Sequence, residues 1–210
     1  MWKWTLIALI PVFFIVFPIY YVFVGSMMTT SQIFHQPPYL FPPSPKELVT
    51  NYSAAFGILG PYFINSIVIT LGVMVVVLLI SPAAAFALAK LDLKLKSVFS
   101  FIFALIQMLP ITATIIPLYL LFREFRLANT LFGVILAISS FSVSYIAIML
   151  TSYMRSFPIS LIESAEIDGA SLSKIYWKIV LPLSMPALAT ASLFSFLQGW
   201  GNFVFPLTLL

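Results

Sequence analysis

The residues able to carry out acid–base, nucleophilic or metal chemistry are few in this chain. It has no cysteine, one histidine and six acidic residues among 210. Thiolate catalysis, disulfides and cysteine-based metal sites are therefore excluded, and His35 alone cannot build a multi-histidine site. The six acids lie between the long apolar stretches and form no constellation typical of an active site. The sequence predicts neither an enzyme nor a bound metal or cofactor.

The polar segment 157–182 is the part of the chain with the clearest pattern. Pro158 suits a first helical turn, and Gly169 suits the left-handed residue that ends a helix. Glu163 and Glu166 lie beside an apolar face with three-residue spacing, made of Ile159, Ile162 and Ala165. A first short amphipathic helix is predicted, ending at the glycine.

A second short helix is predicted after that glycine. Ser171 is a plausible N-cap, and one face carries Leu172, Ile175, Tyr176 and Ile179. Pro182 is then expected to open the next long apolar helix. Two short helices joined at a glycine fit either a knob that a soluble partner grips or an interfacial segment lying on lipid headgroups.

The composition requires a lipid environment for the rest of the chain. Hydrophobic residues make up 62% of it and charged residues 8%, with a mean hydropathy of +1.12. Soluble chains are about 45–50% apolar and about 25% charged. The net charge of +4 comes from scattered residues that form no basic stripe, so no nucleic-acid partner is predicted.

Five uncharged stretches are long enough to cross a bilayer, whose core of about 30 Å needs roughly 20 helical residues. They lie within residues 5–25, 61–89, 97–122, 127–154 and 179–210. The first is too long for a signal peptide and lacks a small-residue cleavage site. The fifth reaches the last residue without a polar tail, so an incomplete chain is expected.

Helix-breaking and small residues divide these stretches further. The segment between the first two is expected to be a loop, with five prolines between Pro37 and Pro45 and a short helix near residues 46–56. Within the stretches, Pro82, Pro110, Pro117, Pro186 and Pro206 either kink the helices or are tolerated there. Small residues after Pro82 predict a close helix contact at Ala83, Ala85, Ala87 and Ala89.

The distribution of lysine and arginine predicts the orientation. With a cytoplasmic N-terminus, the inner side carries Lys3, Lys90, Lys94, Lys96, Arg155, Lys174 and Lys178, and the outer side carries Lys46, Arg123 and Arg126. The larger number on the inside favours this orientation in a cell membrane. His35 is then a solvated residue of the outer loop, and residues 157–182 face the cytoplasm.

Three classes of membrane protein remain open on composition alone. The spans hold no deep acidic, basic or histidine side chain, which disfavours a secondary carrier driven by protons or sodium, although backbone carbonyls can also bind sodium. A non-transporting scaffold or channel is the second class. The third is a permease powered by a partner, because the chain has no Gly-x-x-x-x-Gly-Lys-Ser/Thr phosphate loop of its own.

The patterned segment resembles a known motif. Glu163-Ser164-Ala165, three residues, Gly169, nine residues and then Ile179-Val180-Leu181-Pro182 are similar to the Glu-Ala-Ala loop of ABC importer permeases. That loop reads Glu-Ala-Ala, three residues, Gly, nine residues, Ile-x-Leu-Pro. Only Ser164 departs, since the family usually has alanine there.

Further segments within residues 61–210 resemble the carbohydrate, maltose-type branch of that family. They are Asn65-Ser66, Gln107-Met108-Leu109-Pro110, Ile116-Pro117-Leu118-Tyr119, Asn129-Thr130, Ile167-Asp168-Gly169-Ala170 and the region from Leu181-Pro182 to Pro186-Ala187-Leu188. Such permeases usually have six spans, and a sixth is absent here. Trp200-Gly201-Asn202-Phe203 stands where the family often has Trp-Asn-Glu-Phe.

The resemblance implies an all-α polytopic bundle with the type I ABC importer permease fold. It implies a first helix and outer loop in residues 1–60 and a permease core in 61–210. Two cytoplasmic ATPase subunits, a second permease subunit and an extracytoplasmic sugar-binding protein are the implied partners. The residues implied to couple ATP hydrolysis to transport are Glu163, Ala165, Asp168, Gly169, Ile179, Leu181 and Pro182.

If the substrate is a sugar, hydrogen-bonding and aromatic groups near mid-membrane are the candidates to contact it. They are Gln107, Thr112, Gln198, Trp200 and Asn202. The alternative for each is a hydrogen bond to a neighbouring helix. The second permease subunit is the other possible source of the sugar site.

Overall fold

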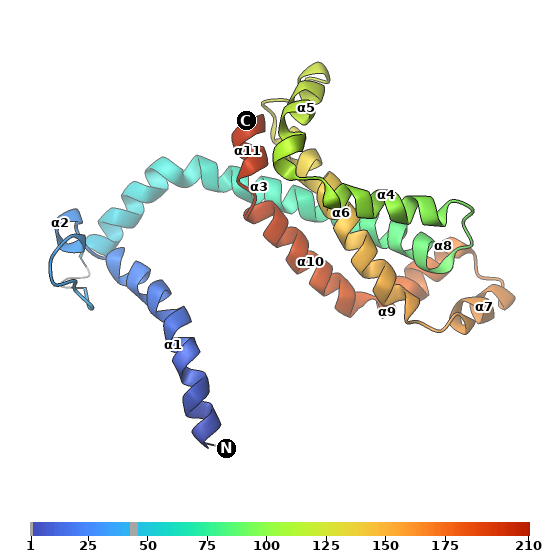
Figure 1. The fold of residues 1–210 in the computed structure, drawn as a ribbon, viewed down its shortest axis with the longest axis horizontal. Coiled ribbons are helices and arrows are strands. Elements are labelled where there is room, and N and C mark those ends of the chain that lie inside the picture. Colours follow the sequence, from blue (N-terminus) through green and yellow to red (C-terminus); the bar gives the residue numbers. More distant parts are fainter. Residues whose placement is uncertain (1, 43–45) are drawn as a thin grey trace. The chain divides into compact units, whose positions relative to one another are not determined.

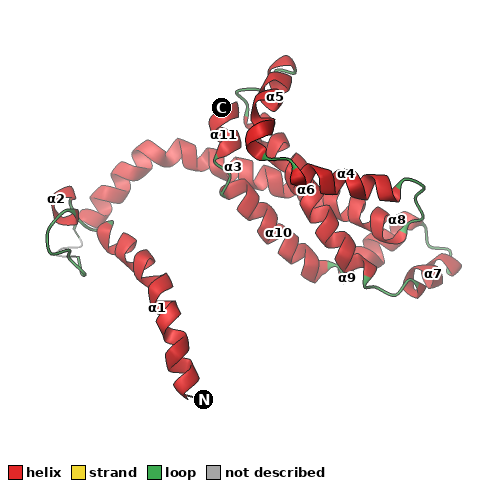
Figure 2. Ribbon diagram, viewed as in Figure 1, coloured by secondary structure: helices red, strands yellow, loops and turns green. Residues whose placement is uncertain are grey.

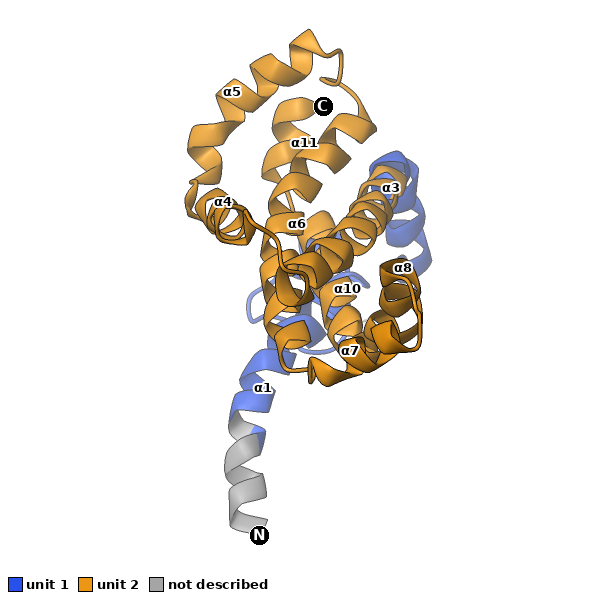
Figure 3. Ribbon diagram, turned by 90° about the vertical axis from the view of Figure 1, so that its right-hand side faces the viewer, with its two compact units in different colours: residues 1–63 blue, residues 64–210 orange. Residues whose placement is uncertain are grey.

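The computed structural model describes residues 2–42 and 46–210, and every regular element in them is helical (Figures 1 and 2). This confirms the predicted all-α fold. The helices are α1 (Trp2–Gly25), α2 (Thr30–Ile33), α3 (Glu47–Lys90), α4 (Lys96–Met108), α5 (Ile111–Glu124), α6 (Leu131–Arg155), α7 (Ser160–Ile167), α8 (Leu172–Ile175), the π-helical turn η1 (Tyr176–Val180), α9 (Leu181–Leu183), α10 (Met185–Trp200) and α11 (Val204–Leu209). The chain forms two compact units, residues 1–63 and 64–210 (Figure 3).

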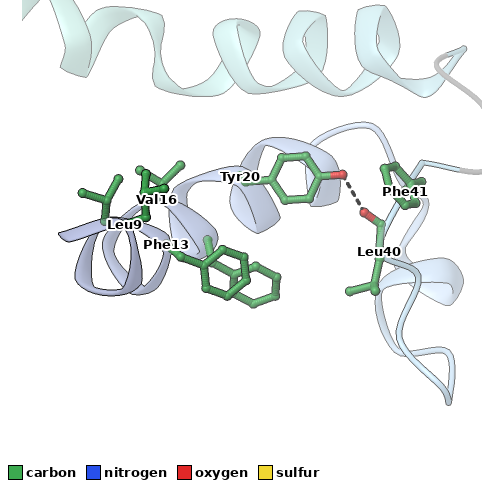
Figure 4. Close-up of a pocket in the computed structure, with 8 residues that line it drawn as sticks. Leu9, Phe13, Val16, Tyr20, Leu40 and Phe41 are labelled. Atoms are coloured by element: carbon green, nitrogen blue, oxygen red, sulfur yellow. Dashed lines mark hydrogen bonds between the residues drawn. The ribbon is translucent and has the colours of Figure 1, made fainter. Parts of the chain in front are cut away.

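The first unit joins α1 to the beginning of α3 through a loop with few regular elements. The Tyr20 hydroxyl donates a hydrogen bond to the Leu40 carbonyl at 2.8 Å beside an apolar cavity of about 750 Å³ (Figure 4). The Asn51 amide donates to the carbonyls of Ser26 and Met28. Residues 43–45 of the predicted proline-rich loop, and the side chain of Lys3, lie outside the described part of the structure.

Helix α3 is longer than the sequence pattern predicts. It begins at Glu47 and continues without a break for 44 residues, through both Pro61 and Pro82. The expected separate short helix near residues 46–56 is therefore wrong. Residues 47–60 contain no proline to stop the helix, and Glu47 places a negative charge in the first turn, where the helix dipole favours it.

The expected single span over residues 97–122 is a bent pair instead. Helices α4 and α5 meet at 105°, because Leu109 and Pro110 are both extended, with ψ of 123° and 126°. A proline cannot donate a backbone hydrogen bond, and it also disfavours helical geometry in the residue before it. Of the two alternatives for these prolines, Pro110 breaks the helix, whereas Pro117 lies inside α5 without ending it.

The expected span over residues 179–210 is interrupted twice. The α8–α9 segment meets α10 at 78°, and the break falls at Ser184, so the prediction that Pro182 opens the span is wrong. Pro182 belongs to the preceding helix, and Pro186 occupies the first turn of α10. After Trp200 the helix stops, and α11 follows as a separate short helix.

Helices α3 and α6 are the two described helices that are individually long and apolar enough to cross a membrane, and the two bent pairs pass the same test together. In the second unit, α6 packs against α4, α10 and α11. Just before α6, the Asn129 backbone N–H donates a hydrogen bond to the Leu209 carbonyl of α11 at 2.7 Å.

The buried face of α10 consists of small residues at every fourth position, namely Ala187, Ala191, Ser195 and Gly199. At Gly199 the backbone of α3 is so close that a Cβ would lie 2.8 Å from the Thr70 Cα. The predicted small-residue contact on α3 is present at Ala85, which is fully buried, while Ala83 is exposed. The absence of a side chain at Gly199 thus allows a close approach of α10 to α3 at Thr70.

The close approach at Gly199 gives a stability prediction. Gly199→Ala should lower the midpoint of thermal unfolding in detergent, with a loss of about 1–3 kcal/mol from overpacking. Gly57→Ala is the matched control, because Gly57 lies in α3 with open space around it and alanine favours a helix by up to about 1 kcal/mol. Equal stabilisation by both substitutions would contradict the packing.

Candidate functional site

The segment from Phe157 to Ser184, here called the hairpin, folds as two short arms joined by a tight turn. The first arm is α7, and Gly169 follows it with φ of +75°. The Ala170 N–H donates to the Ala165 carbonyl at 2.9 Å, and the Gly169 N–H donates to the Glu166 carbonyl at 3.0 Å. These two bonds form a Schellman motif, which requires a left-handed residue at the position of Gly169. The predicted glycine stop is confirmed.

The second arm starts where the sequence predicts. Ser171 caps α8, since its hydroxyl accepts a hydrogen bond from the Lys174 N–H. Ile175 is fully buried and Val180 nearly so, while the ring of Tyr176 lies 5.5 Å from that of Phe86 in α3. This arm is therefore held against the helical core of the second unit.

Both ends of the hairpin are attached to that core. At its start, the Lys90 ammonium, at the end of α3, donates to the Phe157 carbonyl at 2.5 Å. At its end, Val180 belongs to the buried core cluster and Ser184 is fully buried, where the chain turns into α10. The hairpin is thus fixed at its base.

The tip of the hairpin is exposed. Glu163 and Asp168 lie on the surface, and Ile167 between them has 86% of its side chain accessible. A large aliphatic side chain so exposed next to carboxylates is typical of a contact surface rather than of core. The remaining residues of the predicted coupling set are partly covered at Ala165, Ile179 and Leu181 and exposed at Pro182.

Some details of the predicted hairpin are wrong. Pro158 precedes α7 instead of lying in its first turn. Ile162 is buried as expected, but Ile159 is 49% exposed, and Leu172 is 48% exposed although the pattern places it on the buried face. Both exposed residues lie at the N-terminal end of their arm, before the part of the helix that buries Ile162 and Ile175.

A second candidate site is a cavity of about 340 Å³ between α4, α6 and α10. Three of the predicted substrate-contacting residues line it, namely Gln107, Gln198 and Asn202. Thr112 and Trp200 are not among the lining residues. Trp200 stacks on Phe196 instead, with ring centroids 5.9 Å apart, and Thr112 lies beyond the break on α5.

The cavity is lined by uncharged groups. The Asn202 side-chain oxygen accepts a hydrogen bond from the Phe205 N–H at 3.1 Å, which fixes the start of α11. The ring of Phe205 stacks on that of Phe141 at 5.6 Å. Amides beside aromatic rings can bind a neutral hydroxylated molecule by hydrogen bonds and stacking, and the volume lies at the lower end of the usual range for ligand pockets.

Sequence reasoning missed two polar residues of this cavity, Ser142 and Tyr145. Both lie on α6, three residues apart, in the serine-rich run 139–145. Polar residues at three-residue spacing share one helix face, and this spacing was the available signal. The described residues contain no group of three or more side chains suited to hold a metal ion.

Comparison with known proteins places this arrangement among membrane permeases. The model of the family described as "Binding-protein-dependent transport system inner membrane component" matches residues 82–210, and the chain belongs to this family. It is 33% identical over 207 residues to a putative ABC transporter permease protein ORF2 of Caldicellulosiruptor sp. (strain Rt8B.4), covering 98% of this chain and 72% of the relative.

Two further similarities agree with this family assignment. The chain is 27% identical to a diacetylchitobiose uptake system permease protein, NgcG, of Streptomyces coelicolor, covering 98% of this chain and 66% of the relative. It also matches a chain of the crystal structure of a bacterial ABC transporter involved in the import of the acidic polysaccharide alginate, with a TM-score of 0.84 and 27% identity. That match covers 98% of this chain and 72% of the other.

The lining of the cavity gives a prediction for transport. Gln198→Leu removes the amide at similar size and should lower uptake roughly three- to tenfold, the effect of one neutral hydrogen bond. Thr112→Val is the matched control, because Thr112 does not line the cavity, and it should leave uptake unchanged. Uptake into vesicles containing the assembled transporter measures both. A larger loss with Thr112→Val would exclude the cavity as the pathway.

Proposed function

We propose that this chain is a permease subunit of an ABC importer and forms half of the translocation pathway for a sugar or oligosaccharide. The observation that carries the proposal is the hairpin: the motif spacing coincides with a glycine-closed turn whose tip is exposed and whose base is anchored. The relatives named for diacetylchitobiose uptake and alginate import support a carbohydrate substrate.

In this proposal the hairpin is moved by separate ATPase subunits. Two ATPase subunits bind on the cytoplasmic side and hydrolyse ATP there, since the sequence contains no phosphate-binding loop. Glu163 forms a charge-assisted hydrogen bond with a basic residue of the ATPase. Gly169 permits the turn, Asp168 occupies the C-cap position of α7, and Ile179, Leu181 and Pro182 transmit the movement towards α10.

Because this chain forms only half of the translocation pathway, it needs further partners. A second permease subunit, a different chain, completes the pore, and an extracytoplasmic sugar-binding protein delivers the substrate to the outer side. The N-terminus lies in the cytoplasm, and residues 61–210 form the permease core. Gln107, Gln198 and Asn202, which share an uncharged cavity, contact the substrate by hydrogen bonds.

The turn at Gly169 can be tested without disturbing packing, because nothing lies within 4 Å of the position a Cβ would take. Gly169→Val should cost about 1–2 kcal/mol in left-handed geometry and should uncouple ATP hydrolysis from uptake while membrane insertion continues. Gly169→Asn is the control, since asparagine tolerates positive φ. Unchanged transport in the valine variant would refute the coupling role.

The two glutamates of α7 allow a second test. Glu163→Gln should weaken binding of the ATPase subunit roughly tenfold or more, the effect of losing a hydrogen bond to a charged group. Glu166→Gln removes the same charge from the same short helix and should have little effect. Titration of solubilised permease with purified ATPase gives both affinities, and equal losses would mean that only net charge matters.

A further inference from the structure

The hairpin divides its charges between its two arms. Residues 157–173 carry Glu163, Glu166 and Asp168 and no basic side chain. From residue 169 to the last residue there is no acidic side chain, and the only basic ones are Lys174 and Lys178. One arm is therefore negative and the other positive. A partner surface with charge of one sign cannot attract both arms.

The positive arm presents its charges on one exposed face. Lys174, Trp177 and Lys178 follow helical spacing, all three are exposed, and Trp177 has 59% of its side chain accessible. The opposite face holds the buried Ile175 and Val180. An indole between two ammonium groups combines the side chains that are enriched at membrane–water interfaces.

After Lys178 the exposed side chains become apolar within a few residues. Leu183 is 45% exposed and Met185 is 63% exposed, and along α10 Leu193 and Leu197 are exposed as well. Apolar side chains exposed on a helix of this kind face lipid tails. Lys174, Trp177 and Lys178 directly precede these apolar residues in the sequence. In a membrane this order places the three side chains at the depth of the lipid phosphates.

We infer that Lys174, Trp177 and Lys178 form a binding site for the phosphate groups of anionic lipids. Two lysines near an anionic membrane surface are attracted to it, while Glu163 and Glu166 of α7 and Asp168 at its C-cap are repelled from the same surface. The membrane therefore holds the second arm and directs the first arm away, towards the aqueous phase. The inference needs the hairpin at a membrane surface, and it does not depend on binding of an ATPase.

Fluorescence quenching tests this site. The chain has four tryptophans, and replacing Trp2, Trp4 and Trp200 with phenylalanine leaves Trp177 as the reporter. The full chain is placed in phosphatidylcholine vesicles that contain the same fraction of either brominated phosphatidylglycerol or brominated phosphatidylcholine. Phosphatidylglycerol should associate on the order of tenfold more strongly, and added salt should reduce the preference.

Matched variants identify the residues responsible. Lys174→Gln with Lys178→Gln should abolish the preference, whereas Lys174→Arg with Lys178→Arg should retain it and show that the fold is intact. Lys94→Gln with Lys96→Gln removes the same charge from another loop and should leave the preference unchanged.

Four results would overturn the inference. They are equal quenching by both lipids in the parent chain, equal loss in the Lys94 and Lys96 control, displacement by inorganic phosphate at constant ionic strength, and shielding of Trp177 only when an ATPase subunit is added. The last would assign the arm to a protein partner. None of these results depends on transport, so this test and the test of the proposed function can fail separately.

Discussion

The left-handed conformation of Gly169 is the constraint on which the hairpin depends. With φ at +75°, the chain reverses immediately after α7, and the Ala170 N–H reaches back to the Ala165 carbonyl. Ala165 and Ala170, which this bond joins, both pack against the buried core. Without the turn, the exposed tip and the anchored second arm would not be neighbours.

Helix α10 connects the two candidate sites. It begins at Ser184, where the second arm of the hairpin ends, and it carries Gln198 of the cavity near its other end. Its buried face consists of small residues, and at Gly199 it approaches Thr70 of α3 closely. The second arm of the hairpin and the cavity are therefore joined by a single helix.

The sequence predicts the turn at Gly169 and the cap of the second arm at Ser171, because each depends on local chemistry, whereas two of the five predicted spans are bent. Gly169, Ser171 and Pro110 act through their own backbone geometry or hydrogen bonds, and their neighbours in sequence are enough to interpret them. The start of α10 was missed because Pro182 suits a helix start as well as Pro186 does, and only packing around Ser184 decides between them.

The cavity was only partly predictable for a similar reason. Gln107, Gln198 and Asn202 are isolated polar residues in apolar runs and are visible in the sequence. Thr112 and Trp200 have the same appearance but do not line the cavity, and Trp200 stacks on Phe196 instead. Ser142 and Tyr145 share the three-residue spacing of one helix face, but the sequence does not show that this face of α6 lines a cavity.

The central claim is that the tip of the hairpin meets a motor protein in the cytoplasm. The chain has no cysteine, so Ile167→Cys places a single thiol at the exposed tip, and a membrane-impermeant thiol reagent reports on which side it lies. The account predicts labelling in inside-out vesicles stripped of ATPase, none in intact cells, and protection when the ATPase subunits are added back. Labelling from outside intact cells, or no protection by the ATPase, would contradict it.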